Sequence, residues 1–383
     1  MKKKIIYYTQ VYYLDSALEY IQVASKDFDF HVYIEITPHA LKANIFNIDA
    51  DLTEYPLVIP VESVVKKWDI EYISTYLKNC KSCQFLNFSS PKSLDVDSVF
   101  RATKSIAGLY KLHADFVHLD DFSMRQIGML PFFLLKKNSL ILDVHDPKPH
   151  TGEKDIKKVI FSKILYKLTS KYLCLSEYST NILKGILVGK KVYTIKFLPC
   201  SVYQNFIKKD SEIKKEYISF IGRISPYKGI NLFIDAIKNI KDDSVKFMIA
   251  GKQIVGFDLS KEIPDNMPNL VVREKHLSNE EFVDIVQRSM LVVCPYLDAT
   301  QSGVVMTAHA LGCPVVVTPV GALPEYVDEG KNGIVSDDMS PEKLLESINK
   351  GLKEFKHLNQ SPDDTLWTKY AASNLKVMHT LYS

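Results

Sequence analysis

The chain has 383 residues, of which 46% are hydrophobic, and its 48 basic and 45 acidic residues give a net charge of +3. This length allows two domains, each with its own core, and the composition excludes a disordered or fibrous chain. The charge is too balanced to predict nucleic-acid binding. The longest apolar run, residues 127–135, is far shorter than the roughly 20 residues of a membrane-spanning helix. The basic N-terminus has no long apolar stretch, so we expect a first strand there and no signal peptide.

The first half of the chain alternates short apolar runs with segments of helical spacing. Strands are predicted at residues 4–8, 30–36, 55–60, 116–119, 140–144 and 171–176, and helices at 14–24, 99–113 and 154–168. This alternation predicts a parallel sheet with helical crossovers. We place a first, Rossmann-like domain at residues 1–200 and a polar hinge at 201–216.

A second alternation predicts another Rossmann-like domain at residues 217–361. Its strands are expected at 218–221, 246–250, 270–273, 290–294 and 314–318, and its helices at 230–240, 279–288, 304–311 and 341–353. The tail, residues 362–383, has helical spacing. It either docks back on the first domain or packs only on the second.

The cysteines and glycines exclude several classes of site. Only Cys80 and Cys83 lie close together among six cysteines, and no second pair or histidine follows at zinc spacing, so we expect reduced thiols and no metal. Neither a Gly-x-Gly-x-x-Gly turn after the first strand nor a P-loop is present, which argues against a dehydrogenase or a phosphotransferase.

Two cations follow the first predicted strand of the second domain. Arg223 and Lys228 lie between Gly222 and Gly229, in a loop that Pro226 keeps from being helical. A planar guanidinium and a compact ammonium together can neutralise a diphosphate. The alternative is two solvated surface cations before an amphipathic helix.

Two more loops of this domain end in predicted helix starts. Ser302 and Gly303 precede one helix, whose N–H groups and dipole favour an anion; the alternative is simple helix capping. Glu325 follows Pro324 at another start. Its carboxylate either complements the helix dipole or faces the sugar or ribose of a ligand.

The combination of Gly222, Arg223, Lys228 and Gly229 with residues 312–316 and 321–325 resembles the retaining glycosyltransferases of family 4. The match is specific over residues 217–335. The resemblance implies an α/β GT-B fold, in which two facing Rossmann-like domains clamp a nucleotide-sugar and a C-terminal helix crosses back. It implies catalytic roles for Arg223 and Lys228 at the donor diphosphate. The implied donor-binding residues are Gly222, Asp298, Gln301, Ser302, Gly303, Val304, Thr307 and Glu325.

One departure from that family concerns two glutamates separated by seven residues. Alignment on residues 308–312 puts Ala299 and Thr307 at those positions. Thr307 offers one hydrogen bond to ribose, weaker than the charge-assisted bond of a carboxylate. Asp298 is expected to take over part of the role of the first glutamate.

The first domain departs as well, since the loop after its first strand has no glycine. We expect Tyr12 and Tyr13 of this loop on the acceptor side, where they would stack on a sugar face, and His150 of a later loop is expected to touch the acceptor. By resemblance, Asp120 is expected on the acceptor side at a strand end that faces the same cleft, and His145 is expected to contact the transferred sugar. Tyrosines at a strand end are otherwise packing residues, and His145 is otherwise a structural cap of its strand.

The resulting prediction is a retaining, metal-independent glycosyltransferase of hexosyltransferase type. It would use a UDP- or GDP-sugar as co-substrate, without a cofactor, and a glycan or lipid-linked acceptor in surface polysaccharide or glycoconjugate synthesis. The alternative is a catalytically silent relative that binds nucleotide-sugar or supports a partner enzyme. The expected location is cytoplasmic. The basic segment 154–171 is either a peripheral membrane contact at the inner face or an ordinary amphipathic helix.

Overall fold

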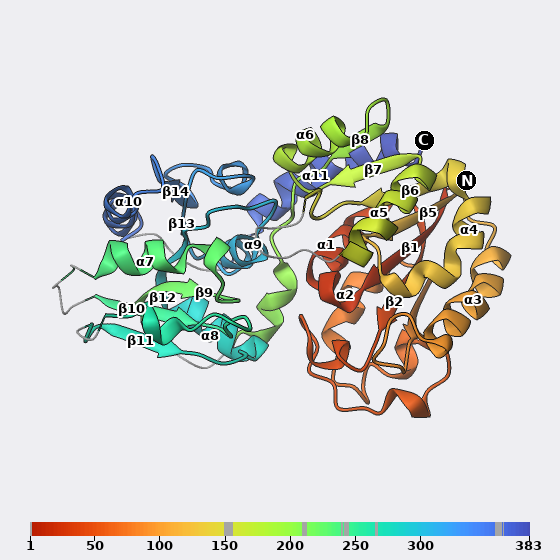
Figure 1. Ribbon diagram of the computed structural model, residues 1–383, viewed down its shortest axis with the longest axis horizontal. Coiled ribbons are helices and arrows are strands. Elements are labelled where there is room, and N and C mark those ends of the chain that lie inside the picture. The colour runs from red at the N-terminus through yellow and green to blue at the C-terminus, as the bar shows by residue number, and fades with distance from the viewer. Residues whose placement is uncertain are drawn as a thin grey trace. The chain divides into compact units, whose positions relative to one another are not determined.

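The computed structural model describes residues 2–148, 156–208, 213–238, 240, 245–264, 267–356, 362 and 364–383. The chain forms two compact units (Figure 1). Unit 1 contains the described residues up to Lys148, those from Ile156 to Leu198, and Lys369–Ser383. Unit 2 contains the described residues from Pro199 to Thr368.

Unit 1 is built on an eight-stranded sheet with the order β3-β4-β2-β1-β5-β6-β7-β8. All neighbouring strands pair parallel except β3 and β4, which pair antiparallel. The strands are β1 Lys4–Gln10, β2 Asp29–Ile36, β3 Val58–Pro60, β4 Ser82–Asn87, β5 Phe116–Asp120, β6 Leu140–Asp143, β7 Lys171–Cys174 and β8 Lys191–Thr194.

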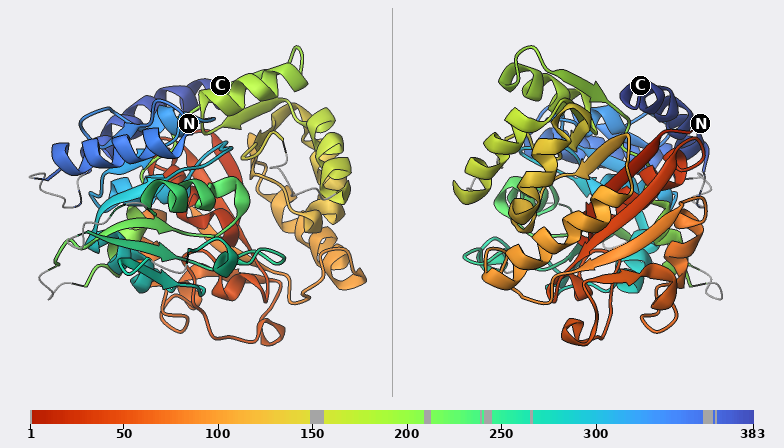
Figure 2. Two further views of the ribbon diagram at one scale, coloured as in Figure 1. Left: turned by 60° about the vertical axis from the view of Figure 1, so that its left-hand side comes forward. Right: turned by 90° about the vertical axis from the view of Figure 1, so that its right-hand side faces the viewer.

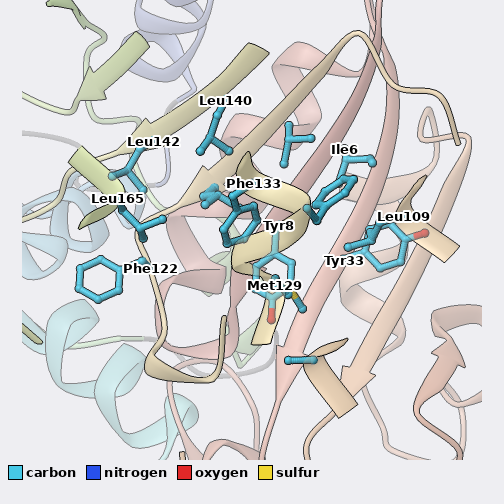
Figure 3. Packing of buried hydrophobic residues seen from close by; sticks show 14 of the residues in the cluster. Ile6, Tyr8, Tyr33, Leu109, Phe122, Met129, Phe133, Leu140, Leu142 and Leu165 are labelled. Atoms are coloured by element: carbon cyan, nitrogen blue, oxygen red, sulfur yellow. The ribbon is translucent and has the colours of Figure 1, made fainter. Parts of the chain in front are cut away.

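Helices cover both faces of this sheet (Figure 2). They are α1 Leu14–Ala24, α2 Ser74–Leu77, α3 Val96–Lys111, α4 Leu130–Leu135, α5 Ile156–Leu168, α6 Glu177–Ile186 and α11 Thr365–Leu381, which belongs to unit 1 from Lys369 onwards. Successive side chains of a strand point to opposite faces. Ile6 and Tyr8 of β1 therefore pack with Leu109 of α3, Phe133 of α4 and Leu165 of α5 (Figure 3).

The alternate residues of β1 point to the other face, which α1 and α11 cover. Tyr7 stacks on Tyr20 of α1 with ring centroids 5.3 Å apart. Tyr382, directly after α11, packs edge-on against Phe30 of β2 at 6.1 Å. Asn374 of α11 also exchanges two hydrogen bonds of 2.8 Å with the backbone of Lys196. These contacts make the C-terminal residues part of the core of unit 1.

Unit 2 has a six-stranded parallel sheet with the order β11-β10-β9-β12-β13-β14. Figure 1 shows α7 and α10 on one face of this sheet and α8 on the other. The strands are β9 Tyr217–Ile221, β10 Lys246–Ala250, β11 Leu270–Arg273, β12 Ser289–Cys294, β13 Val315–Val317 and β14 Gly333–Val335. The helices are α7 Ile230–Ile237, α8 Asn279–Arg288, α9 Gly303–Ala310 and α10 Pro341–Glu354.

The predicted α/β fold with two Rossmann-like domains and parallel sheets is confirmed, with the antiparallel β3 as an exception. Three strands were not predicted: β4, β8 and β14. The first residues of the predicted hinge form a short 3-10 helix, η8 Ser201–Phe206, which is part of unit 2. There the Gln204 amide donates to the Ala310 carbonyl at 2.8 Å. The hinge itself stays a prediction.

Candidate functional site

The two predicted cations lie in the loop that follows β9. The 3-10 helix η9 (Pro226–Lys228) begins with a proline and ends at Gly229, whose φ of 68° favours glycine. A Cβ on Gly229 would also lie 1.8 Å from the carbonyl oxygen of Pro295. Arg223 is exposed, and its Nη2 donates to the Tyr227 hydroxyl at 3.2 Å. The glycine thus allows this loop to pack against the end of β12.

Tyr296, which the sequence argument did not use, connects Lys228 to the start of α9. The Lys228 Nζ donates to the Tyr296 hydroxyl at 3.0 Å and lies 4.5 Å from the centre of that ring. The Tyr296 hydroxyl is also 3.5 Å from Ser302 Oγ, at the edge of hydrogen-bond distance. Burial raises the pKa of Tyr296 well above its ordinary value, so the phenol stays neutral. At this contact, the ammonium therefore donates to a neutral phenol.

The predicted helix start at Ser302 is observed. Ser302 is the N-cap of α9, and its Oγ accepts from the Val305 N–H at 3.3 Å, so the capping alternative is also realised. A Cβ on Gly303 would meet no atom within 4 Å, which leaves this helix start open. Val304 lies against Gly222, since a Cβ there would be 3.2 Å from Val304 Cγ2. The first N–H groups of a helix have no intrahelical acceptor and favour an anion.

The third predicted segment, residues 321–325, packs on the loop before α9. Gly321 has φ of 55°, and a Cβ on it would lie 1.8 Å from the carbonyl oxygen of Ala299. That oxygen accepts from the Ala322 N–H at 2.9 Å. Glu325 follows in the 3-10 helix η11 (Leu323–Tyr326), where it is half-buried. The structure thus joins the three predicted pieces at the carboxyl ends of β9, β12 and β13.

The remaining predicted donor residues differ in exposure. Asp298 and Gln301 are half-buried in the loop between β12 and α9. Ala299 is 1% exposed and Thr307 is 2% exposed. The threonine hydroxyl therefore offers little surface to a ribose in this conformation, and its predicted role stays a prediction.

In unit 1, two of the predicted residues form a buried ion pair. His145 Nε2 lies 2.7 Å from Asp120 Oδ1, and both side chains are 3% exposed. Thr9 Oγ1 donates to the other Asp120 oxygen at 2.6 Å. Burial favours neutral His145, but the hydrogen bond and charge of Asp120, with neighbouring carboxylates, outweigh it and raise the pKa of His145 to about 10. The imidazole is therefore a cation at neutral pH.

The two predicted tyrosines differ in what they contact. Tyr13 stacks on His145 with ring centroids 4.2 Å apart, and its hydroxyl donates to Asp121 Oδ2 at 2.8 Å. One face of its ring is therefore already covered. Tyr12 is 50% exposed. His150 lies outside the described residues.

A second buried network was not predicted from the sequence. His118 Nε2 lies 2.5 Å from Asp143 Oδ1, and its Nδ1 lies 2.6 Å from the Tyr382 hydroxyl, which also contacts the Tyr20 hydroxyl at 2.9 Å. Asp120, Asp143 and His145 together line a small cavity of about 20 Å³ in unit 1. His118 lies two residues before Asp120 on β5; this spacing was the only available signal.

Neither a metal cluster nor a membrane helix occurs in the described part of the chain. No group of three or more His, Cys, Asp or Glu side chains there could hold a metal ion. Of the helices the structure describes, none is both long and apolar enough to cross a bilayer.

Comparison with known proteins relates unit 2 to sugar transferases. Residues 215–354 match the family model described as glycosyl transferases group 1. An uncharacterized glycosyltransferase of Methanocaldococcus jannaschii is 27% identical over 226 residues, 56% of this chain and 61% of that protein. The D-inositol 3-phosphate glycosyltransferase of Corynebacterium urealyticum is 26% identical over 152 residues, 37% of this chain and 36% of that protein. The chain thus spans less than two thirds of either relative.

Solved structures share the fold over nearly the whole chain. The sucrose-phosphate synthase of Thermosynechococcus elongatus has a TM-score of 0.62 at 13% identity and 99% coverage of both chains. Anabaena HepE in complex with UDP-glucose has a TM-score of 0.57 at 13% identity, covering 99% of this chain and 97% of its own. The UDP-GlcNAc 2-epimerase of Neisseria meningitidis reaches 0.54 at 13% identity, with 99% and 100% coverage. Because transferases and epimerases share this fold, the fold alone does not decide the reaction.

Proposed function

We propose that the chain is a retaining glycosyltransferase that moves a sugar from a UDP- or GDP-sugar to a hydroxyl of a glycan or lipid-linked acceptor. One observation carries the proposal: the Lys228 ammonium lies beside the open N-terminus of α9, held by Tyr296 at 3.0 Å. Arg223 and Lys228 both follow β9, at the sheet edge where parallel α/β folds bind ligands. An ammonium, a guanidinium and helix N–H groups suit a diphosphate.

The comparisons support a nucleotide-sugar as the donor. The segment that matches the group 1 family model contains Arg223, Lys228 and the start of α9. HepE, which shares the fold, has been solved with UDP and with UDP-glucose. The proposed donor residues further include Gly222, whose missing side chain leaves room beside Lys228.

The proposed reaction needs charge stabilisation more than a carboxylate pair. The bond between the sugar and the diphosphate breaks, and the acceptor oxygen bonds to the sugar on the same face. A departing phosphate oxygen takes the proton of the acceptor hydroxyl. Lys228, Arg223 and the N-terminus of α9 stabilise the negative charge that develops on the leaving group. Two cations can neutralise the diphosphate, so we propose that no metal is required.

For unit 1 we propose acceptor binding. The cationic His145, oriented by Asp120, would place a positive charge near the transferred sugar. Tyr12 is exposed enough to stack on a sugar face. Each role is testable by substitution without touching the donor site.

We also propose an inner-membrane-surface location, because α5 exposes both apolar and basic side chains. Ile160 and Ile164 are 58% and 43% exposed, and Lys163 and Lys167 are exposed on the same helix. Apolar and basic residues together bind anionic interfaces. Co-sedimentation with phosphatidylglycerol vesicles tests this idea. No binding even at low salt refutes it, and a lipid-linked acceptor then loses this support.

A silent relative remains the second candidate, favoured by the burial of Ala299 and Thr307 at the usual glutamate positions. The test is a thermal-shift and calorimetric screen against UDP, GDP, ADP, CMP and their sugar conjugates. We expect binding of one nucleotide that Lys228→Met weakens by at least about tenfold, as for a charged hydrogen bond. Sugar transfer then separates the enzyme from the silent relative, and NMR of the product anomer tests retention. No binding of any nucleotide refutes the donor site.

A further inference from the structure

A polar pocket of unit 1 lies at the carboxyl end of β1, apart from the small cavity beside His145. Its volume is about 210 Å³, and its polar lining comes from Gln10, Tyr13, Ser93, Ser123 and Arg125. At about 30 Å³ per water molecule, this is room for roughly seven waters. The pocket is large enough for a phosphate or carboxylate group with part of a sugar ring.

Gln10 brings an unused hydrogen-bond donor to this pocket. The residue is only 9% exposed, and its buried Nε2 has no hydrogen-bond partner among the described residues. A buried donor without a partner is unfavourable, and native proteins rarely keep one without a reason. This amide therefore lies at the pocket wall with one donor group that no described residue uses.

Arg125 supplies a second donor and a positive charge. Its side chain is 12% exposed. Its Nη2 donates to the carbonyls of Ser90 at 3.2 Å and Pro91 at 3.0 Å, which fixes the guanidinium. Its buried Nε has no partner among the residues that the structure describes. The guanidinium is thus held at the pocket wall with one N–H group that no described residue uses.

The buried carboxylate of Glu35 does not use this donor. Glu35 Oε1 lies 4.0 Å from Arg125 Nη1, beyond hydrogen-bond distance. The two Glu35 oxygens instead accept from the Tyr8 and Ser123 hydroxyls, both at 2.7 Å. Of the described residues that line the pocket, Gln10 and Arg125 have buried polar atoms without a partner, and both atoms, Gln10 Nε2 and Arg125 Nε, are N–H donors.

We propose that this pocket binds the anionic group, phosphate or carboxylate, of an acceptor, with Gln10 and Arg125 as the residues that select it. Assigning the anionic group to an acceptor rests on the proposed transferase function. Tyr13 lines the pocket and stacks on His145 at 4.2 Å. The anionic group is thus separated by one aromatic ring from the histidine assigned to the transferred sugar.

The test uses inorganic phosphate as the probe and the full chain carrying Arg223→Ala and Lys228→Ala, which removes the proposed donor site. Calorimetry measures phosphate affinity with Gln10 intact, as Gln10→Met and as Gln10→Glu. We expect a several-fold loss for methionine and a loss of about tenfold or more for glutamate, which adds repulsion to the lost charged hydrogen bond. Gln22→Glu, on α1, is the matched control and should change nothing.

Two results would overturn the proposal: unchanged phosphate affinity in Gln10→Glu, or equal losses in the two Gln10 variants, which would mean that the bound phosphate does not lie close enough to residue 10 to be repelled by a carboxylate there. Arg125→Lys keeps the charge but removes Nε, and should also weaken binding; it serves if a Gln10 variant fails to fold. If phosphate binding depends on Gln10 but the wild-type chain binds no nucleotide, the donor site is refuted and the anion pocket is still supported.

The source of the anion is decided by competition with inorganic phosphate. Competition by glucose 6-phosphate alone supports a soluble acceptor, and competition by phosphatidylglycerol vesicles alone supports a lipid-borne one. Whichever competition is observed must disappear in Gln10→Glu. Competition by neither overturns the acceptor role.

Discussion

The buried pair of His145 and Asp120 makes the stability of unit 1 depend on pH in a defined direction. Asp120→Asn keeps the shape of the side chain and an oxygen that can accept from Thr9 or His145, but removes the charge. The wild-type pair has a hydrogen bond of 2.7 Å and is 3% exposed on both sides. The substitution therefore isolates the ionic part of the interaction.

The magnitude follows from the pKa of His145, which the structure raises from 6.5 to about 10. At about 1.36 kcal/mol per pKa unit, this difference corresponds to roughly 5 kcal/mol, near the 3–5 kcal/mol typical of breaking a buried pair. The folded pKa lies above the unfolded one. The stabilisation is therefore complete below about pH 6.5, and it is lost as the pH rises towards 10.

The assay is urea unfolding of wild type and Asp120→Asn at pH 6, 8 and 10, in a Trp367→Phe background. Trp68, 3% exposed in unit 1, is then the only tryptophan and reports this unit alone. The control is Asp27→Asn, which breaks an exposed Asp–His pair of similar length, 2.8 Å to His379. An exposed pair contributes at most about 1 kcal/mol.

We expect Asp120→Asn to lose about 3–5 kcal/mol at pH 6, less at pH 8, and little at pH 10. Lysine and tyrosine titration near pH 10 occurs in both proteins and cancels in the difference. A loss that is the same at all three pH values, or no larger than that of the exposed pair, refutes a cationic His145.

Three further substitutions test other contacts. Gly229→Ala should lower the melting temperature of unit 2 and abolish nucleotide binding, because its Cβ would meet the Pro295 carbonyl at 1.8 Å. The control is Gly185→Ala in α6, where a Cβ meets no atom within 4 Å, and it should be neutral or stabilising. Equal effects of the two substitutions would contradict this reasoning. Tyr382→Phe removes a hydroxyl with two buried contacts and should cost about 1–3 kcal/mol in urea unfolding; no loss would mean that these contacts are not stabilising. Lys228→Met should lower kcat by about 10²–10³ with any active donor, and a value within tenfold of wild type would exclude the leaving-group role.

Most strands that sequence predicted well are buried on both faces; β11 is an exception, since it lies at a sheet edge and none of its residues is fully buried. β9 is apolar except for Ser219, and β12 is apolar over residues 290–294, as expected of central parallel strands. The three strands that were missed lack this signal. β8 and β14 are at sheet edges, and β14 is only three residues long. β4 begins with half-buried Ser82 and Cys83 and becomes fully buried only at Phe85, so half of it carries no apolar pattern.

For the candidate site, the sequence predicted which residues take part but not which residues they contact. The spacing of glycines and cations was enough to place Arg223, Lys228 and Ser302 near one sheet edge. It did not show that Tyr296 would join Lys228 to Ser302, because that contact depends on how two loops 68 residues apart pack. The contact of His118 with Tyr382 spans 264 residues, and no local pattern encodes such a distance.

The missing glutamates are better understood from packing than from sequence alignment. The backbone of Ala299 holds the following loop, because its carbonyl accepts from the Ala322 N–H and Gly321 packs directly on it. A longer side chain at 299, which is 1% exposed, would need another loop conformation. The same loop also fixes η11, and with it Glu325. If transfer takes place here, its charge stabilisation must therefore come mainly from Lys228, Arg223 and the start of α9, which is why their substitution separates an active enzyme from a silent relative.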